Sequence, residues 1–235
     1  LYAVVDTVWA LGLGISAIIY YLMASPETWR AHLALAVMLF WSGRLGLHLL
    51  RDRALTGKED PRYLALAEHW GERARFRFLF VFLGQIPLVA VFVLPFALVL
   101  GHDEPAWRML DTIGLIIAVV ALAGETVADH QLARFRARPD SSGKVCREGL
   151  WNYSRHPNYF FEWLHWFAYV AFALGAPFGW LSLVGPVMMY IFLRYITGIP
   201  FAERSSLKSR GDAYRNYQKT TNTFFPWKPQ QDHSS

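Results

Sequence analysis

The chain has 235 residues, of which 54% are hydrophobic, 16% are aromatic and only 17% are charged. Soluble domains carry about 25% charged residues, so this composition indicates a membrane protein and excludes an ordinary soluble domain. The single cysteine, Cys146, excludes an internal disulfide framework. A net charge of +5 can indicate a nucleic-acid partner. Here the basic residues stand in loops between apolar runs, where the positive-inside rule accounts for them, so we expect no nucleic-acid partner.

Six apolar runs reach or approach the length of about 20 residues that crosses a bilayer as a helix. They predict an all-α fold, a polytopic membrane helix bundle. The chain begins at Leu1 and not at methionine, so we allow for one helix upstream and expect about six to seven transmembrane helices. Residues 1–228 are expected to form a single integral-membrane domain, and residues 229–235 a disordered tail. The runs are Ala3–Ala24, Ala31–Leu50, Phe78–Leu100, Trp107–Val127, Tyr159–Leu174 and Trp180–Pro200.

The connections between these runs alternate in charge. Three of them are short and carry few basic residues, whereas Arg51–Arg77, Asp129–Asn158 and the tail from Glu203 are long and basic. Basic loops stay in the cytoplasm according to the positive-inside rule. We therefore expect a multi-pass protein whose basic loops and C-terminus are cytoplasmic.

Several ionisable side chains stand inside the apolar runs, where a charge at the bilayer centre costs roughly 2.5–3.5 kcal/mol on insertion scales. Arg44 and His48 are four residues apart, and so are Asn158 and Glu162, so each pair shares a helical face. Singly, such residues are often snorkelling side chains or interhelical pairs. Together with Asp129, they gather toward the basic loops, which predicts a polar pocket for a large anionic cofactor.

No common metal or nucleotide motif competes with this interpretation. The sequence has no H-E-x-x-H motif and no cysteine cluster, so we expect no metal site. It also has no Walker loop and no G-x-G-x-x-G motif after a strand.

The stretch GLWNYSRHPNYFFEW, Gly149–Trp163, belongs to a set of motifs that runs along almost the whole chain. Together they resemble bacterial membrane proteins of unknown function that are grouped with steroid 5α-reductases, which implies the bacterial inner membrane. The wider superfamily also contains isoprenylcysteine carboxyl and phospholipid methyltransferases, which share an Arg-His-Pro-x-Tyr element but use S-adenosylmethionine. The other motifs are VVDTVWALG, FWSGRLGLHLL, KEDPRY, ETVADHQLARF, TGIPFAERSSL and YRNYQKTTNTFFPW.

The resemblance implies an NADPH-dependent membrane oxidoreductase, similar to a 3-oxo-5α-steroid 4-dehydrogenase. Such an enzyme transfers a hydride to an activated C=C bond, usually conjugated to a ketone. Its substrate is expected to be a lipophilic small molecule, steroid-like or otherwise, that enters from the bilayer. Membrane lipids are therefore expected partners as well.

The resemblance also implies which residues hold NADPH. Asn158 and Glu162 match an Asn-x-x-x-Glu pair that holds the nicotinamide end. Asp129 and Arg136 match polar cofactor contacts. The other implied cofactor residues, of which the loop arginines also satisfy the positive-inside rule, are Arg53, Arg62, Tyr63, Tyr153, Arg155, His156, Tyr159 and Glu203.

The substrate side departs from the steroid 5α-reductases, which hold the substrate ketone with a Glu and a Tyr. Here the nearest carboxylate is Asp6, and the Tyr position falls at about Trp41. An indole N–H can donate a hydrogen bond but cannot supply a proton, so a buried Asp6 is one candidate proton donor. Arg44 is expected to stabilise an enolate oxygen. The other candidate proton donors are Tyr20, Tyr21 and Tyr63.

Two other functions remain open. One is an S-adenosylmethionine-dependent methyltransferase of a lipid or prenylated substrate; such enzymes tend to carry a Glu-Glu pair after the last helix, where this chain has Glu203 and Arg204. The other is a non-enzymatic lipid- or sterol-binding membrane protein. The number of polar residues near the membrane argues against it, because each costs insertion energy.

Overall fold

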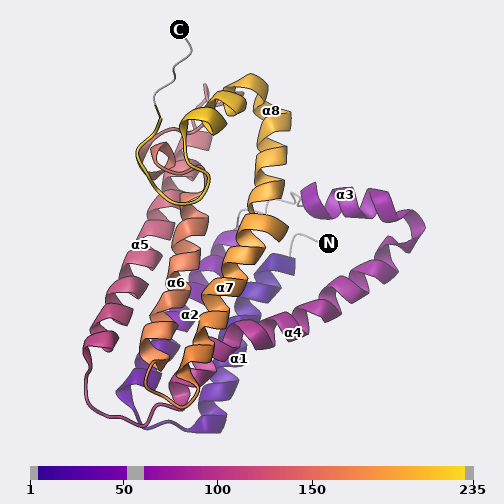
Figure 1. Cartoon of the computed structure of the whole chain (residues 1–235). Coiled ribbons are helices and arrows are strands. Elements are labelled where there is room, and N and C mark those ends of the chain that lie inside the picture. The colour runs from indigo at the N-terminus through magenta and orange to yellow at the C-terminus, as the bar shows by residue number, and fades with distance from the viewer. Residues whose placement is uncertain (1–4, 52–60, 231–235) are drawn as a thin grey trace. The chain divides into compact units, whose positions relative to one another are not determined.

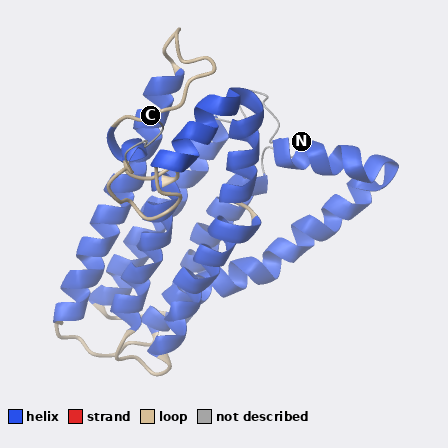
Figure 2. Cartoon of the chain, turned by 45° about the horizontal axis from the view of Figure 1, so that its top comes forward, coloured by secondary structure: helices blue, strands red, loops and turns tan. Residues whose placement is uncertain are grey.

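The computed structural model describes residues 5–51 and 61–230. These residues form helices and no strand (Figure 2), which confirms the predicted all-α fold. Figure 1 shows the course of the chain through its helices. The α-helices are α1 Val5–Ala24, α2 Trp29–Leu49, α3 Pro61–Trp70, α4 Ala74–Leu100, α5 Met109–Arg136, α6 Pro157–Ala173, α7 Val184–Ile191 and α8 Ile199–Thr220. Short 3-10 helices are η3 Gly71–Arg73, η4 Gly149–Asn152 and η5 Gly179–Leu183, and η6 Phe192–Ile196 is a π-helix.

Some of the described helices have the length and composition of membrane spans, where the sequence predicted about six to seven spans. Five helical segments are long and apolar enough to cross a membrane. Helix α6 has 17 residues and corresponds to the short fifth run of the sequence. The five segments are Asp6–Ala24, Trp29–Leu49, Phe76–Leu100, Met109–Arg136 and Gly179–Thr220.

Helical structure continues beyond two of the apolar runs. Helix α5 ends at Arg136 instead of Val127, and α8 carries the basic tail in helical form to Thr220. Hydropathy marks only the apolar part of a helix. A helix continues into water wherever its residues favour it, and the Gln, Leu, Ala and Arg residues after Val127 are good helix formers.

Local sequence signals fix several helix starts. Thr28 caps α2, because its side-chain oxygen accepts a hydrogen bond from the amide of Ala31 at 3.4 Å. Pro61 and Pro157 are the first residues of α3 and α6, a position where the missing N–H of proline costs nothing.

The chain divides into two compact units, each made of two segments. The first unit contains Leu1–Gly114 and Tyr169–Gly185, and the second contains Leu115–Ala168 and Pro186–Ser235. Both are described separately below.

Small residues let α1 and α2 approach closely in the first unit. A Cβ atom on Gly14 would lie 3.0 Å from Cβ of Ser42, and one on Gly46 would lie 2.6 Å from Cδ2 of Leu11. The hydroxyl of Ser42 also donates to the carbonyl of Ala10 at 2.8 Å. Small residues and interhelical hydrogen bonds of this kind are typical of membrane helix packing.

A closed ionic cluster forms part of the same unit, where α4 connects to α5. Arg30 and Asp111 are fully buried, and Nε of Arg30 lies 2.8 Å from Oδ1 of Asp111. Arg30 also donates to the carbonyls of Glu104 at 2.6 Å and Ala106 at 3.0 Å. Arg108 donates to both carboxylate oxygens of Asp111 and to the carbonyl of Leu174. The buried charges are therefore compensated by one another and by the backbone.

Candidate functional site

The Arg-His-Pro element in the second unit is anchored to α5 before α6 begins. The indole N–H of Trp151 donates to the carbonyl of Ala128 at 2.9 Å, and the amide of Leu150 donates to the side chain of Gln131 at 3.0 Å. Gly149 has a φ of +55°, in the left-handed region that favours glycine. Its Cβ would also lie 2.6 Å from Cδ of Gln131, so this turn requires glycine.

Arg155 uses its guanidinium to tie this element to α8 and the segment behind it. Nε lies 2.7 Å from Oε1 of Glu203, Nη1 donates to the carbonyls of Gln218 and Thr221, and Nη2 donates to the hydroxyl of Thr223 at 2.8 Å. Arginine has five N–H donors, and four of them are engaged within the protein. In this structure Arg155 stabilises the fold of the C-terminal segment, and its expected contact with a cofactor stays a prediction.

His156 and Glu203 extend the same network. Nε2 of His156 lies 3.3 Å from Oε1 of Glu203, and Nε2 of Gln218 donates to Oε2 of Glu203 at 2.8 Å. Burial lowers the pKa of His156 from its ordinary value, although the Glu203 carboxylate opposes that shift. The imidazole, which stacks on Tyr159 with ring centroids 5.5 Å apart, is therefore neutral at pH 7.

A polar face on α6 lies next to this network in the sequence. Asn158, Glu162 and His165 are spaced by four and three residues and share one helical face. Glu162 and His165 are buried. Nδ2 of Asn158 donates to Oδ1 of Asp129 on α5 at 3.2 Å.

The carbonyl oxygen of Asn158 is the open position of this face. Oδ1 is buried and has no hydrogen-bond partner among residues 5–51 and 61–230. A buried acceptor without a donor costs free energy, so the position favours a ligand with an N–H group. A carboxamide such as that of nicotinamide has this chemistry, and the residues present fit the expected cofactor in this respect.

The second unit contains most of the predicted cofactor residues. Asp129 and Tyr159 are half-buried, whereas Arg136 and Tyr153 are exposed. The predicted cofactor residues in this unit are Asp129, Arg136, Tyr153, Arg155, His156, Asn158, Tyr159, Glu162 and Glu203.

The first unit contains the predicted substrate residues. The phenol of Tyr63 donates to Oδ1 of Asp6 at 3.1 Å, so a residue assigned to the cofactor by resemblance pairs with the candidate proton donor. Trp41 is fully buried, and Arg44 is half-buried on α2.

The structure does not describe the side chains of two predicted loop arginines. Arg53 lies outside the described residues, and of Arg62 the structure gives only its place in α3.

A second polar position in the second unit, at Arg194, was not among the predicted site residues. Arg194 and six residues of α7 and the C-terminal segment line a pocket of about 450 Å³. A single arginine in an apolar run also fits a snorkelling residue, so its position in the sequence does not favour a ligand. The aromatic residues of TNTFFPW line the same pocket as Arg194. This neighbourhood exists only in the folded chain, so the sequence alone could not show it.

One protein family matches the chain. Its model, described as a protein of unknown function (DUF1295), covers residues 1–221, so the chain belongs to this family. No curated protein and no solved structure matches the chain.

Proposed function

We propose that this member of the DUF1295 family is an NADPH-dependent membrane reductase that saturates an activated C=C bond in a lipophilic substrate. The observation that carries the proposal is the buried, open Oδ1 of Asn158, beside Asp129 and on the same helical face as Glu162. The motif resemblance to steroid 5α-reductases supports it. NADPH, when bound, supplies the hydride for such a reduction.

The polar face of α6 has a positioning role in this proposal. Asn158 accepts a hydrogen bond from the carboxamide, and its own amide is oriented by Asp129. Glu162 is buried on the same face and provides carboxylate oxygens as further acceptors. Two acceptors in a fixed arrangement orient one face of the nicotinamide ring, which is the geometric requirement for transfer of a hydride.

Tyr63 is the favoured proton donor of the reaction. Of the candidate tyrosines, it is the one that hydrogen-bonds Asp6. Tyr20 and Tyr21 lie further along α1, roughly 20 Å from Asp6 at 1.5 Å per residue. A phenol that is hydrogen-bonded to a carboxyl group can give its proton to a substrate and take another proton from that carboxyl group. Within the first unit, Arg44 is the candidate to stabilise an enolate oxygen.

Thermal unfolding of the detergent-purified protein tests the ligand class. NADPH and S-adenosylmethionine are added separately, and a ligand at 100-fold its dissociation constant should stabilise the fold by roughly 2.7 kcal/mol. We expect a response to NADPH and none to S-adenosylmethionine. Stabilisation by S-adenosylmethionine alone would indicate a methyltransferase. Stabilisation by neither ligand would contradict the proposal that the protein binds NADPH.

Turnover then tests the reaction. The protein and NADPH are incubated with a series of lipophilic enones, steroids first, and oxidation of NADPH is followed together with the saturated product. Tyr63→Phe should remove most of the turnover and leave NADPH binding intact. Full turnover by Tyr63→Phe would exclude Tyr63 as the proton donor.

A further inference from the structure

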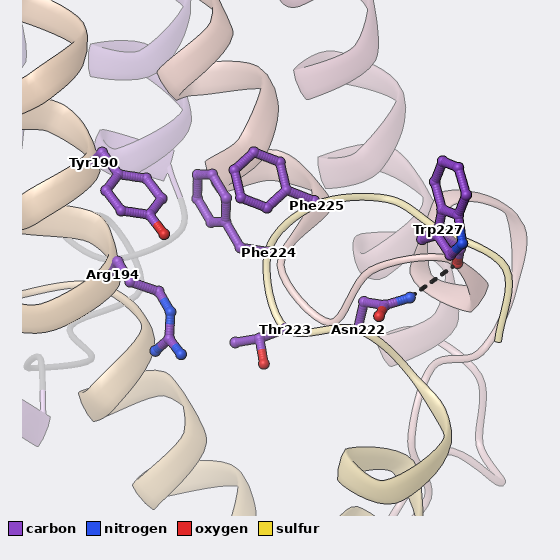
Figure 3. A pocket seen from close by; sticks show the side chains of 7 residues that line it. All are labelled: Tyr190, Arg194, Asn222, Thr223, Phe224, Phe225 and Trp227. Atoms are coloured by element: carbon purple, nitrogen blue, oxygen red, sulfur yellow. Dashed lines mark hydrogen bonds between the residues drawn. The ribbon is translucent and has the colours of Figure 1, made fainter. Parts of the chain in front are cut away.

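A pocket in the second unit lies outside the site proposed above. Its volume of about 450 Å³ is within the range of about 300–1,000 Å³ that is typical of small-molecule sites. Tyr190, Arg194 and Phe224 converge on it, as Figure 3 shows. The complete lining is Tyr190, Arg194, Asn222, Thr223, Phe224, Phe225 and Trp227.

The pocket and the polar face of α6 are on opposite sides of that helix. Trp163 contacts Phe224, Phe225 and Tyr190 at centroid distances of 5.7, 5.6 and 6.0 Å. At 100° per residue, positions 160, 163 and 167 point away from positions 158, 162 and 165. Phe160 contacts Phe224 and Phe225 as well. The aromatic wall of the pocket therefore packs on the side of α6 that does not carry Asn158.

Arg194 is the open cation of this pocket. It makes a cation–π contact with the ring of Tyr195, at 5.3 Å from the centroid. Within the described part of the chain, its guanidinium makes no hydrogen bond and no ion pair. Arg155, in the same unit, has four N–H donors engaged. An arginine that is half-buried and keeps its donors open is suited to an anion.

The backbone around Arg194 departs from the α-helix. Arg194 stands in the π-helix η6, and the amide of Thr197 donates to the carbonyl of Phe192 at 2.8 Å. The turn ends at Gly198, whose Cβ would lie 2.6 Å from the carbonyl oxygen of Leu193, so only glycine fits. Single π-turns in helices occur frequently at functional sites.

The lining indicates the charge of the ligand. Arg194 is its one charged residue, and no carboxylate lines it. The hydroxyl of Thr223 accepts a hydrogen bond from Arg155 and keeps its own proton to donate. One cation and one hydroxyl donor match a singly charged phosphodiester better than the several charges of a dinucleotide phosphate.

The surroundings of the pocket indicate that this anion belongs to an amphiphile. Exposed apolar side chains flank Arg194 on its helix: Tyr195 is 62% exposed and Ile196 48%. Phe225 and Trp227 on the pocket itself are 51% and 74% exposed. Exposed aromatic residues at the end of a membrane span are typical of the membrane–water interface, where basic pockets bind lipid headgroups.

We infer that this pocket binds a phospholipid through its headgroup phosphate, with Arg194 and Thr223 on the phosphate oxygens and the aromatic side chains against the glycerol and upper acyl region. This site does not include Asn158 or Glu162, which lie on the other side of α6, although its Thr223 accepts a hydrogen bond from Arg155, a predicted cofactor residue. Its ligand is a resident lipid and not the reduced substrate.

The test measures binding of dioctanoyl phosphatidylglycerol to the full chain in neutral maltoside detergent, by thermal stabilisation. Dioctanoylglycerol has the same tails without the phosphate, and inorganic phosphate has the anion without the tails. We expect stabilisation by the phospholipid, at most a small response to either control, and a loss of affinity of about tenfold or more in Arg194→Gln. Arg215→Gln, which removes an exposed positive charge from the same unit, should bind like the wild type.

Four outcomes would overturn the inference. The first is equal affinity for the phospholipid in Arg194→Gln and the wild type. The second is stabilisation by inorganic phosphate as strong as by the phospholipid, which would indicate a free anion site. The third is loss of NADPH stabilisation in Arg194→Gln, which would assign the pocket to the cofactor. If Arg194→Gln does not fold, Arg194→Lys keeps the charge and should still bind the phospholipid. The fourth outcome is a response of Arg194→Lys to the phospholipid that is no larger than its response to dioctanoylglycerol.

Discussion

The ionic cluster of the first unit and two polar groups of the second unit are arranged in opposite ways. In the first unit Arg30, Arg108 and Asp111 satisfy one another and the neighbouring carbonyls. In the second unit Oδ1 of Asn158 and the guanidinium of Arg194 are left open within the described residues. Because a polar group near the bilayer is costly, a closed group has a structural explanation and an open group indicates a ligand.

Within one sequence motif, some polar residues have their partners in the protein and others do not. Arg155 stands within the Arg-His-Pro element beside Asn158, yet it resembles Arg30 in the way its donors are consumed. A motif shared by a family therefore mixes residues that build the site with residues that contact the ligand.

The largest effect on the free energy of unfolding is expected when the ionic cluster of Arg30, Arg108 and Asp111 loses its carboxylate. Asp111→Asn leaves the buried guanidinium of Arg30 without its counter-charge, and we expect a loss of about 3–5 kcal/mol in the free energy of unfolding. Denaturant titration of helicity in detergent measures it. Asp212→Asn removes an ion pair whose carboxylate is 90% exposed and should stay within about 0.5 kcal/mol of the wild type. Similar losses in both variants would contradict the role given to the cluster.

A smaller loss is expected when the geometry of Arg155 changes and its charge remains. Arg155→Lys keeps the ion pair with Glu203 but loses hydrogen bonds to Thr221 and Thr223, so we expect a loss of about 1–3 kcal/mol. The segment behind α8 should then become more sensitive to chymotrypsin after Trp227. Unchanged cleavage would mean that Arg155 does not hold this segment.

The open arginine should matter little for folding. Arg194→Gln removes no hydrogen bond or ion pair within residues 5–51 and 61–230, so the free energy of unfolding without lipid should change by less than about 0.5 kcal/mol. The measurement is the same denaturant titration in neutral detergent. A loss as large as that of Asp111→Asn would place Arg194 among the structural residues.

The smallest effect concerns pH. Burial lowers the pKa of His102 from its ordinary value of 6.5, and the charges of Arg108 and Arg30 lower it further. Below pH 6.5 the unfolded chain therefore binds a proton that the folded chain does not, and the free energy of unfolding falls as pH decreases. Melting temperatures between pH 7.5 and 5.5 should fall less in His102→Asn than in the wild type. Equal slopes would exclude His102 as the cause.

The sequence predicted the helices well because their apolar runs are long. It placed the end of α5 too early and did not predict α8 beyond Pro200, since hydropathy does not report helix beyond the apolar segments. It also singled out Asn158, Glu162 and Asp129, whose helical spacing is visible in one dimension.

Contacts between distant segments were out of reach of the sequence. The hydrogen bond from Tyr63 to Asp6 joins residues 57 positions apart, and Arg155 reaches carbonyls more than 60 positions away. Which arginine is closed and which is open depends on such contacts. Periodicity and motifs contain no information about them.

The measurement that tests the central claim most directly is an NADPH titration that compares the two sides of α6. Energy transfer from tryptophan to bound NADPH gives the dissociation constant. Asn158→Ala removes the open acceptor, and Phe167→Leu changes the opposite side of the helix, next to Trp163. We predict that Asn158→Ala weakens NADPH binding about tenfold or more and that Phe167→Leu leaves it unchanged. Equal affinities in Asn158→Ala and the wild type would contradict the account.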